Sequence, residues 1–309
     1  MSKLDFDLVI IGGGPAGLAA GLYAARAKLN AILIEKMVPG GQILVTDWIE
    51  NYPGFPEGIS GADLVLKMTD QVRKFGLPIE GHEVLNVDFN QPIKKLQLND
   101  KDLYAKSVII ATGASPRKLR IPGEDIFYGK GVSTCATCDG PFYKDGVVAA
   151  VGGGDTAVQE SIFLTKFARK VYLIHRRDRL RAEAILQERA LSNGKIEMLW
   201  DSVVKRIDGL TNVERISVEN LKTGVTKNLK VDACFIWVGI LPNTGFLKDA
   251  VALDQSGFVI VDSNMKTSAP GVFAAGDVRN TPLRQIVTAV GDAAIAAVSA
   301  EHYIEAVSR

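Results

Sequence analysis

The chain has little of several features that would place it in a class at once. Only three of its 309 residues are cysteine, and its 36 basic residues almost balance 35 acidic ones. Three cysteines are too few for a disulfide framework, and secreted proteins seldom leave an odd thiol. The net charge of +1 indicates neither a nucleic-acid nor an anionic membrane partner. No apolar run has the length of a transmembrane helix.

What is present is typical of a globular protein of about two domains, each of roughly 150 residues. Hydrophobic residues make up 47% and charged residues 23%, and low-complexity segments are absent. The N-terminus enters an apolar strand at Phe6–Ile11 and lacks the charged start of a signal peptide. We therefore expect a soluble cytoplasmic protein.

One pattern of strand, glycine turn, helix and strand occurs twice, over residues 6–34 and 147–174. Its first copy has apolar runs at 8–11 and 31–34 around an alanine-rich helix at 16–27. Its second has runs at 147–151 and 171–174 around a helix that extends to Lys166. Such alternation predicts parallel sheets with right-handed crossovers. The predicted fold class is α/β, with two domains of one general type.

Pro/Gly-rich connections separate these elements. Asn51–Gly58 must be a loop, since its prolines remove donors and disfavour helix. A strand at 107–111 ends in Thr112–Pro116, and Phe235–Pro242 ends similarly; these are the candidate crossing points between domains. A third apolar run, 272–275, precedes Gly276 and Asp277, and an alanine-rich terminal helix begins near Arg284.

The first glycine turn has the spacing Gly12-x-Gly14-x-x-Gly17. Its glycines allow a tight turn, the approach of a pyrophosphate, and close packing of helix on strand. The phosphate then faces the positive end of the helix. Glu35, at the tip of the next strand, can accept hydrogen bonds from ribose hydroxyls. This context favours nucleotide binding over a merely structural turn.

The second turn, Gly152-x-Gly154-x-x-Ala157, has alanine in the packing position and no acidic partner. A basic run stands at the tip of the strand that follows, about twenty residues on. Arginines there favour a 2′-phosphate, whereas an acid would favour a free 2′-hydroxyl. A solvated basic helix start is the alternative. The position favours NADPH over NADH, and the candidate residues are His175, Arg176, Arg177 and Arg181.

A Cys-x-x-Cys pair, Cys135 and Cys138, lies between the two turns and is followed by Asp139. Two cysteines at this spacing can close a disulfide ring, and the adjacent carboxyl could protonate a departing thiolate. Half a zinc site or two unrelated thiols are the alternatives. A zinc site would need a second pair, and the remaining Cys234 and the histidines are scattered, so we expect no metal. Cys234 itself lies in an apolar run and is predicted to be a core residue.

The segment around the pair predicts only a short helix. Ser133 and Thr134 are plausible helix-start residues, and a helix N-terminus would lower the pKa of a cysteine in its first turn. Pro141 follows soon, so Gly140 is expected to be extended.

With these residues, the chain resembles the low-molecular-weight thioredoxin reductases of bacterial type along almost its whole length. The order and spacing of the motifs together are highly specific. The motifs are GGGPAG at Gly12, GGQ at Gly40, ENYPG at Glu50, ATG at Ala111, CATCDG at Cys135, GGGDTA at Gly152, HRRDRLR at His175 and AAGD at Ala274.

This resemblance implies a flavoprotein homodimer of two Rossmann-like three-layer dinucleotide-binding domains, one inserted into the other. FAD would bind a discontinuous domain, 1–116 and 244–309, and NADPH a domain at 117–243 that carries the dithiol. The family also implies further flavin contacts for the matching residues here, which are Gly41, Gln42, Asn51, Asp277, Arg284 and Gln285.

The activity that the resemblance implies is thioredoxin-disulfide reduction. NADPH would reduce the flavin, and the flavin would reduce the Cys135–Cys138 disulfide. Cys138 would face the flavin, Cys135 would attack the disulfide of thioredoxin, and Asp139 would be the acid. Pro141 and Lys130 depart from the family pattern, so the partner is thioredoxin or a thioredoxin-like protein.

Three alternatives remain. A ferredoxin-driven reductase of the same fold would have no use for the three arginines. A peroxiredoxin-linked reductase carries, in the related family, an extra N-terminal dithiol domain. A non-catalytic nucleotide-sensing module would need the glycine turns but no dithiol.

Overall fold

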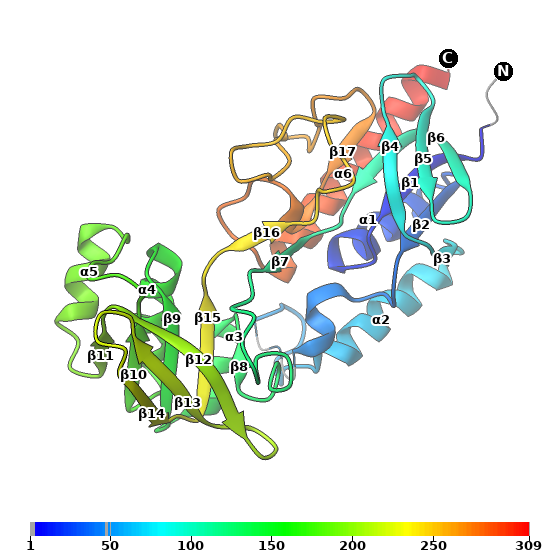
Figure 1. The fold of residues 1–309 in the computed structure, drawn as a ribbon. Helices are drawn as coiled ribbons and strands as arrows, with labels where there is room; N and C mark the ends of the chain where they lie inside the picture. The colour runs from blue at the N-terminus through cyan, green and yellow to red at the C-terminus, as the bar shows by residue number, and fades with distance from the viewer. Residues whose placement is uncertain (1–3, 47–48, 50, 309) are drawn as a thin grey trace. The chain divides into compact units, whose positions relative to one another are not determined.

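The computed structural model describes residues 4–46, 49 and 51–308. The chain forms two compact units, Met1–Ser115 with Leu241–Arg309, and Pro116–Ile240. The first unit is thus discontinuous in sequence, and the second is inserted between its two parts (Figure 1). No helix among the described residues is both long enough and apolar enough to span a membrane.

A mixed sheet forms the centre of the first unit, in the order β3-β2-β1-β6-β5-β4, with β17 also paired to β6. Strands β1, β2, β3 and β17 join it in parallel, and β4 and β5 join it antiparallel. The strands are β1 (Phe6–Ile11), β2 (Ala31–Glu35), β3 (Ile79–Gly81), β4 (Val84–Asp88), β5 (Lys94–Leu98), β6 (Asp102–Ile110) and β17 (Val272–Ala274).

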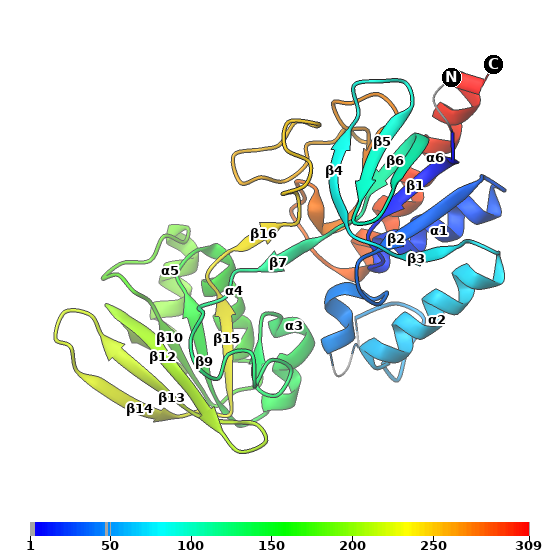
Figure 2. The same cartoon turned by 45° about the vertical axis from the view of Figure 1, so that its right-hand side comes forward.

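Helices cover one face of the parallel strands (Figure 2), and on the other face residues of β4, β5 and residues 247–259 complete a second core. Alternate residues of β1 point to opposite faces, so Leu8 and Ile10 pack with the helices while Val9 and Ile11 join the second core. The helices are α1 (Pro15–Arg26), α2 (Gly61–Lys74) and α6 (Ile286–Ser308), with the 3-10 turns η1 (Gly41–Val45) and η3 (Gly276–Val278). The buried alanines of α1 and α6 let these two helices pack closely together.

The second unit repeats the three-layer plan around a parallel sheet of order β11-β10-β9-β15-β8. On β9, Val148 and Ala150 face the helices, whereas Ala149 and Val151 face a three-stranded antiparallel sheet. The strands are β8 (Val132–Ser133), β9 (Val147–Gly152), β10 (Lys170–Ile174), β11 (Ile196–Leu199), β12 (Ser202–Gly209), β13 (Val213–Asn220), β14 (Thr226–Lys230) and β15 (Ala233–Trp237). The helical segments are α3 (Ala136–Asp139), η2 (Gly140–Tyr143), α4 (Asp155–Leu164) and α5 (Ala184–Leu191).

The chain passes between the units along two short strands, β7 (Ala114–Pro116) and β16 (Ile240–Pro242), which pair with each other. The Arg117 amide donates to the Gly239 carbonyl at 2.9 Å, and the Asn243 amide donates to the Gly113 carbonyl at 3.0 Å. Two connections far apart in sequence are therefore joined by backbone hydrogen bonds. The predicted fold class, two Rossmann-like three-layer domains with one inserted into the other, is confirmed.

Candidate functional site

In the first unit, the turn after β1 brings helix and strand very close. Gly12 has a φ of 107°, which favours glycine. A Cβ at Gly17 would overlap the carbonyl oxygen of Gly12, whereas one at Gly14 would meet nothing within 4 Å. Gly14 is the N-cap of α1. The helix N-terminus is therefore open at this point, as the binding of a phosphate requires.

Glu35, at the end of β2, is tied to this turn by both carboxylate oxygens. Its Oε2 accepts from the Gly13 amide at 2.6 Å, and its Oε1 accepts from the Met37 amide at 2.9 Å. Each oxygen of a carboxylate has a second acceptor position. The strand tip is thus fixed and can still accept hydrogen bonds from a ribose.

The GGQ motif lies against the same turn. The Gly40 amide donates to the Gly13 carbonyl at 2.8 Å. A Cβ at Gly41, whose φ is 58°, would stand 3.4 Å from the Cα of Gly14. Gly41 and Gln42 are exposed at the start of η1. Two motifs that are well separated in sequence are therefore adjacent.

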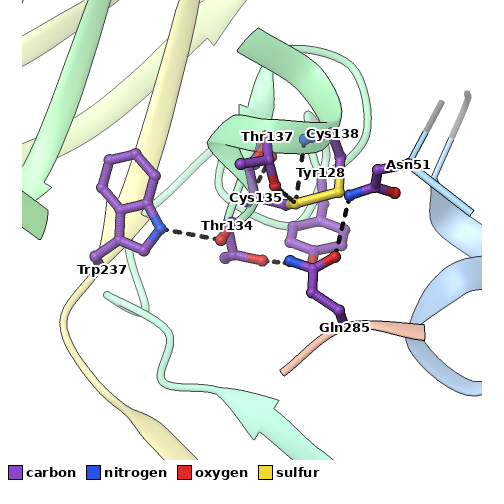
Figure 3. The surroundings of a disulfide bond; sticks show 9 residues. Asn51, Tyr128, Thr134, Cys135, Thr137, Cys138, Trp237 and Gln285 are labelled. Atoms are coloured by element: carbon purple, nitrogen blue, oxygen red, sulfur yellow. Dashed lines mark hydrogen bonds between the residues drawn. A yellow bond between two sulfur atoms is a disulfide. The ribbon is translucent and has the colours of Figure 1, made fainter. Parts of the chain in front are cut away.

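A residue from the second part of the first unit contacts the ENYPG motif. The Asn51 Nδ2 donates to the Gln285 Oε1 at 3.1 Å, across 234 positions of sequence (Figure 3). The guanidinium of Arg284 lies over the Phe258 ring at 4.3 Å, and its buried Nε has no hydrogen-bond partner among the described residues. Glu50, which opens the ENYPG motif, lies outside the described residues.

Asp277 lies in η3, which begins at the left-handed Gly276 beside Ala16 of α1. Asp292 of α6 holds this turn: its Oδ2 accepts from the Gly276 amide at 3.2 Å. Asp292 also forms a bidentate pair with Arg279, at 2.6 Å and 2.7 Å. This pair was not among the predicted site residues, although an aspartate on the buried face of an apolar helix indicates a paired charge.

Burial raises the pKa of Asp277 to about 6; Arg284 opposes this shift and Asp292 adds to it. Burial also lowers the pKa of Arg284. The two partly buried side chains thus influence each other electrostatically, and Asp277 follows the turn that lies beside Ala16 of α1. The buried Arg284 Nε, which has no hydrogen-bond partner among the described residues, fits a polar cofactor whose groups supply the missing hydrogen bond.

In the second unit, the turn after β9 packs in the same way with alanine in place of the third glycine. A Cβ at Gly152 would come within 2.5 Å of the Cβ of Ala157, which is fully buried. A Cβ at Gly154, the N-cap of α4, would meet nothing within 4 Å. The N-terminus of α4 is therefore open as well.

The basic run after β10 divides into one buried and three exposed side chains. His175 is buried beneath Gly153, and this burial lowers the pKa of its imidazole. Arg176, Arg177 and Arg181 are exposed. Within the described residues, none of the three forms an ion pair.

Two backbone contacts fix this run beside the turn. The Arg181 amide donates to the Gly153 carbonyl at 2.7 Å, and the Glu183 amide donates to Asp155 Oδ1 at 2.7 Å. Asp155 was not among the predicted site residues; its place in the first turn of a helix is the signal that could have found it. The exposed arginines are thus held near the open N-terminus of α4.

The same unit holds the cysteine pair. Cys135 and Cys138 form a disulfide, with their Cα atoms 5.4 Å apart. Cys135 Sγ accepts from the Cys138 amide at 3.3 Å and lies 3.4 Å from Thr137 Oγ1 (Figure 3). Both cysteines are half-buried. Asp139 ends the helix, and its amide donates to the Cys135 carbonyl at 3.1 Å.

Two local predictions about this segment were wrong. The N-cap of α3 is Cys135 itself, not Ser133 or Thr134, because its sulfur accepts the Cys138 amide. Ser133 Oγ accepts instead from the Cys135 amide at 3.0 Å. Gly140, before Pro141, is helical (φ −53°, ψ −42°) rather than extended; glycine has no Cβ to clash with the proline ring.

The segment before the disulfide is anchored by the last residue of β15. Trp237 Nε1 donates to the Thr134 carbonyl at 3.0 Å. Cys234, on the same strand, is fully buried, and this burial raises the pKa of its thiol to about 12. It is a core residue, as predicted. Among the described residues, no group of three or more His, Cys, Asp or Glu side chains is arranged to hold a metal ion.

Asp277→Asn is expected to stabilise the flavin-free protein at neutral pH. Because the folded-state pKa is raised, the parent protein loses stability as the pH rises from about 4 to about 6. The variant does not lose stability in this way, because an asparagine side chain does not ionise. Thermal unfolding should show the variant more stable by about 2 kcal/mol above pH 6, and equal near pH 4.

Asp70→Asn, on the exposed face of α2, is the control and should change stability equally little at both pH values. A difference between Asp277→Asn and its parent that does not vary with pH would contradict the assignment of a raised pKa to Asp277.

Comparison with known proteins agrees with this geometry. A model of the pyridine nucleotide-disulphide oxidoreductase family matches residues 6–293. A thioredoxin reductase of Peptoclostridium acidaminophilum is 47% identical over 307 residues, covering 97% of this chain and 98% of that protein. A thioredoxin reductase of Bacillus subtilis (strain 168) is 43% identical over 301 residues, covering 97% and 95%.

A solved structure of thioredoxin reductase from Streptococcus pyogenes MGAS5005 is 48% identical, with a TM-score of 0.92, and the match covers 97% of this chain and 98% of that one. The glycine turns, the disulfide and these matches along almost the whole chain lead to one conclusion. The chain belongs to the thioredoxin reductases of the pyridine nucleotide-disulphide oxidoreductase family.

Proposed function

We propose that this chain is a thioredoxin-disulfide reductase that passes electrons from NADPH through FAD to the Cys135–Cys138 disulfide, and from there to thioredoxin or a thioredoxin-like protein. The observation that carries the proposal is a disulfide in the same unit as an open glycine turn flanked by exposed arginines. Membership of the family implies a flavin and a pyridine nucleotide.

FAD would bind the domain formed by residues 1–116 and 244–309. Its pyrophosphate would meet the N-terminus of α1 at Gly12, Gly14 and Gly17, and its ribose would meet Glu35. The adjoining polar groups of the first unit would hold the rest of the flavin; they are Gly41, Gln42, Asn51, Asp277, Arg284 and Gln285. When bound, FAD accepts a hydride and releases two electrons.

NADPH would bind the domain formed by residues 117–243. Its pyrophosphate would meet the N-terminus of α4 at Gly152 and Gly154, where Ala157 allows the close packing. Arg176, Arg177 and Arg181 would bind the 2′-phosphate through charge-assisted bonds. His175 would contribute by supporting the glycine turn, because its buried ring packs against Gly153.

The sulfur chemistry balances with two electrons. Two electrons enter the disulfide at Cys138, the S–S bond breaks, and the Cys135 sulfur leaves as a thiolate. Asp139 would supply the proton taken up by the partner sulfur that departs in the next step. The Cys135 thiolate then attacks one sulfur of the partner's disulfide and displaces the other. Cys138 attacks Cys135, which re-forms the disulfide and releases the reduced partner.

The alternatives fit the residues less well. A ferredoxin-driven reductase would leave the exposed arginines without a role, and a nucleotide sensor would leave the disulfide without one.

A dithiol that cycles between its two states suits the reducing cytoplasm, where lasting disulfides are rare. From the family resemblance we also propose a homodimer.

Replacing Arg176, Arg177 or Arg181 with alanine is expected to raise the KM for NADPH by about tenfold or more, because each loses a charge-assisted bond to the 2′-phosphate. The KM for NADH should hardly change. Arg179→Ala is the matched control, an exposed arginine of the same run. Equal losses with NADPH and NADH would contradict the role of these residues in reading the phosphate.

Turnover with oxidised thioredoxin tests the function itself. The flavin-loaded protein should oxidise NADPH continuously in its presence, and Cys135→Ser or Cys138→Ser should each abolish this turnover. A Cys138→Ser variant that still reduces thioredoxin would remove the dithiol from the mechanism. Turnover with reduced ferredoxin but not with NADPH would reject the proposed donor.

A further inference from the structure

Thr137 lies between the two cysteines on α3, and its hydroxyl is 3.4 Å from Cys135 Sγ. Neither sulfur of a disulfide carries a hydrogen, so the threonine hydroxyl must be the donor in this contact. The Cys138 amide donates to the same sulfur at 3.3 Å. Figure 3 shows both donors converging on Cys135.

The two sulfurs are therefore unequal in their surroundings. Within the part of the chain that the structure describes, no hydrogen bond reaches the sulfur of Cys138. The Thr137 hydroxyl makes no other hydrogen bond there either. Among the described residues, the reacting sulfur is therefore the one hydrogen-bond partner of this hydroxyl.

Negative charge appears on Cys135 Sγ in both halves of the proposed reaction. It appears first when Cys135 leaves as a thiolate, and it persists until that thiolate attacks the partner's disulfide. A thiolate is a far better acceptor than a disulfide sulfur, so both hydrogen bonds strengthen when the charge forms. Donors placed in advance where charge develops lower the barrier without reorganisation.

We propose that the Thr137 hydroxyl is a further catalytic group of this chain, one that stabilises the thiolate of Cys135 both as leaving group and as nucleophile. This inference rests on the proposed function for its place in the reaction. The contact itself lies entirely within α3 and its N-cap.

The test is the pH dependence of alkylation of Cys135 by iodoacetamide in flavin-loaded Cys138→Ser protein. Cys135 is then the one accessible thiol, because the third cysteine of the chain, Cys234, is fully buried. Thr137→Val in this background keeps the shape of the side chain and removes the hydroxyl. It should move the alkylation profile to higher pH and slow alkylation near neutral pH by about fivefold.

Two matched variants separate the hydroxyl from a structural effect. Thr137→Ser keeps the donor and should restore the profile of the parent. Thr134 precedes the cysteine pair, and its hydroxyl lies 3.3 Å from the Tyr128 hydroxyl. Thr134→Val removes that hydroxyl and should leave the alkylation profile unchanged. An unshifted profile for Thr137→Val, or equal shifts for Thr137→Val and either Thr137→Ser or Thr134→Val, would overturn the proposal.

This measurement uses neither NADPH nor thioredoxin, so it does not depend on the proposed function. If the proposed function is wrong, turnover with thioredoxin fails while the alkylation profiles still report on Thr137. If only Thr137 has no role, Thr137→Val keeps the parent's profile and the parent still turns over.

Discussion

Both units depend on one constraint: at the glycine turn, the helix must approach the preceding strand very closely. In the first unit, Gly17 has no room for a side chain against the Gly12 carbonyl; in the second, Ala157 fits against Gly152. This packing brings the helix N-terminus to the carboxyl edge of a parallel sheet, where its free amides attract an anion. Gly14 and Gly154 leave that position open in both units.

Around each open turn, the two units carry different charged groups. In the first unit, a fixed carboxylate stands at the strand tip, and the buried Asp292–Arg279 pair holds the turn that carries Asp277. In the second unit the carboxylate is replaced by exposed arginines tied to the turn through backbone bonds. The difference in charge at equivalent places of two similar domains supports the proposal that they bind different cofactors.

The sequence was sufficient to predict the strands and helices beside the glycine turns, since glycine spacing and apolar runs are local signals. The β12–β14 sheet and the antiparallel strands β4 and β5 were not predicted, nor was α2, although Ser60 as its N-cap and its buried stripe at Leu64, Val65 and Val72 are local signals that could have found it. The Asn51–Gln285 hydrogen bond joins residues 234 positions apart, and only the family resemblance grouped them. Cys135 as its own helix cap could not be predicted, because cysteine is not a usual capping residue. The prediction for Gly140 failed because glycine has no Cβ to clash with the ring of Pro141, so it can remain helical before a proline.

The central claim is that a flavin and the Cys135–Cys138 disulfide lie on one electron path. Anaerobic titration of the flavin-loaded protein with NADPH tests it most directly, because it counts the electrons that the protein takes up. The account predicts about four electrons per chain, two for the flavin and two for the disulfide, and about two for a variant with both cysteines changed to serine. Equal uptake by the parent and this variant would contradict the account.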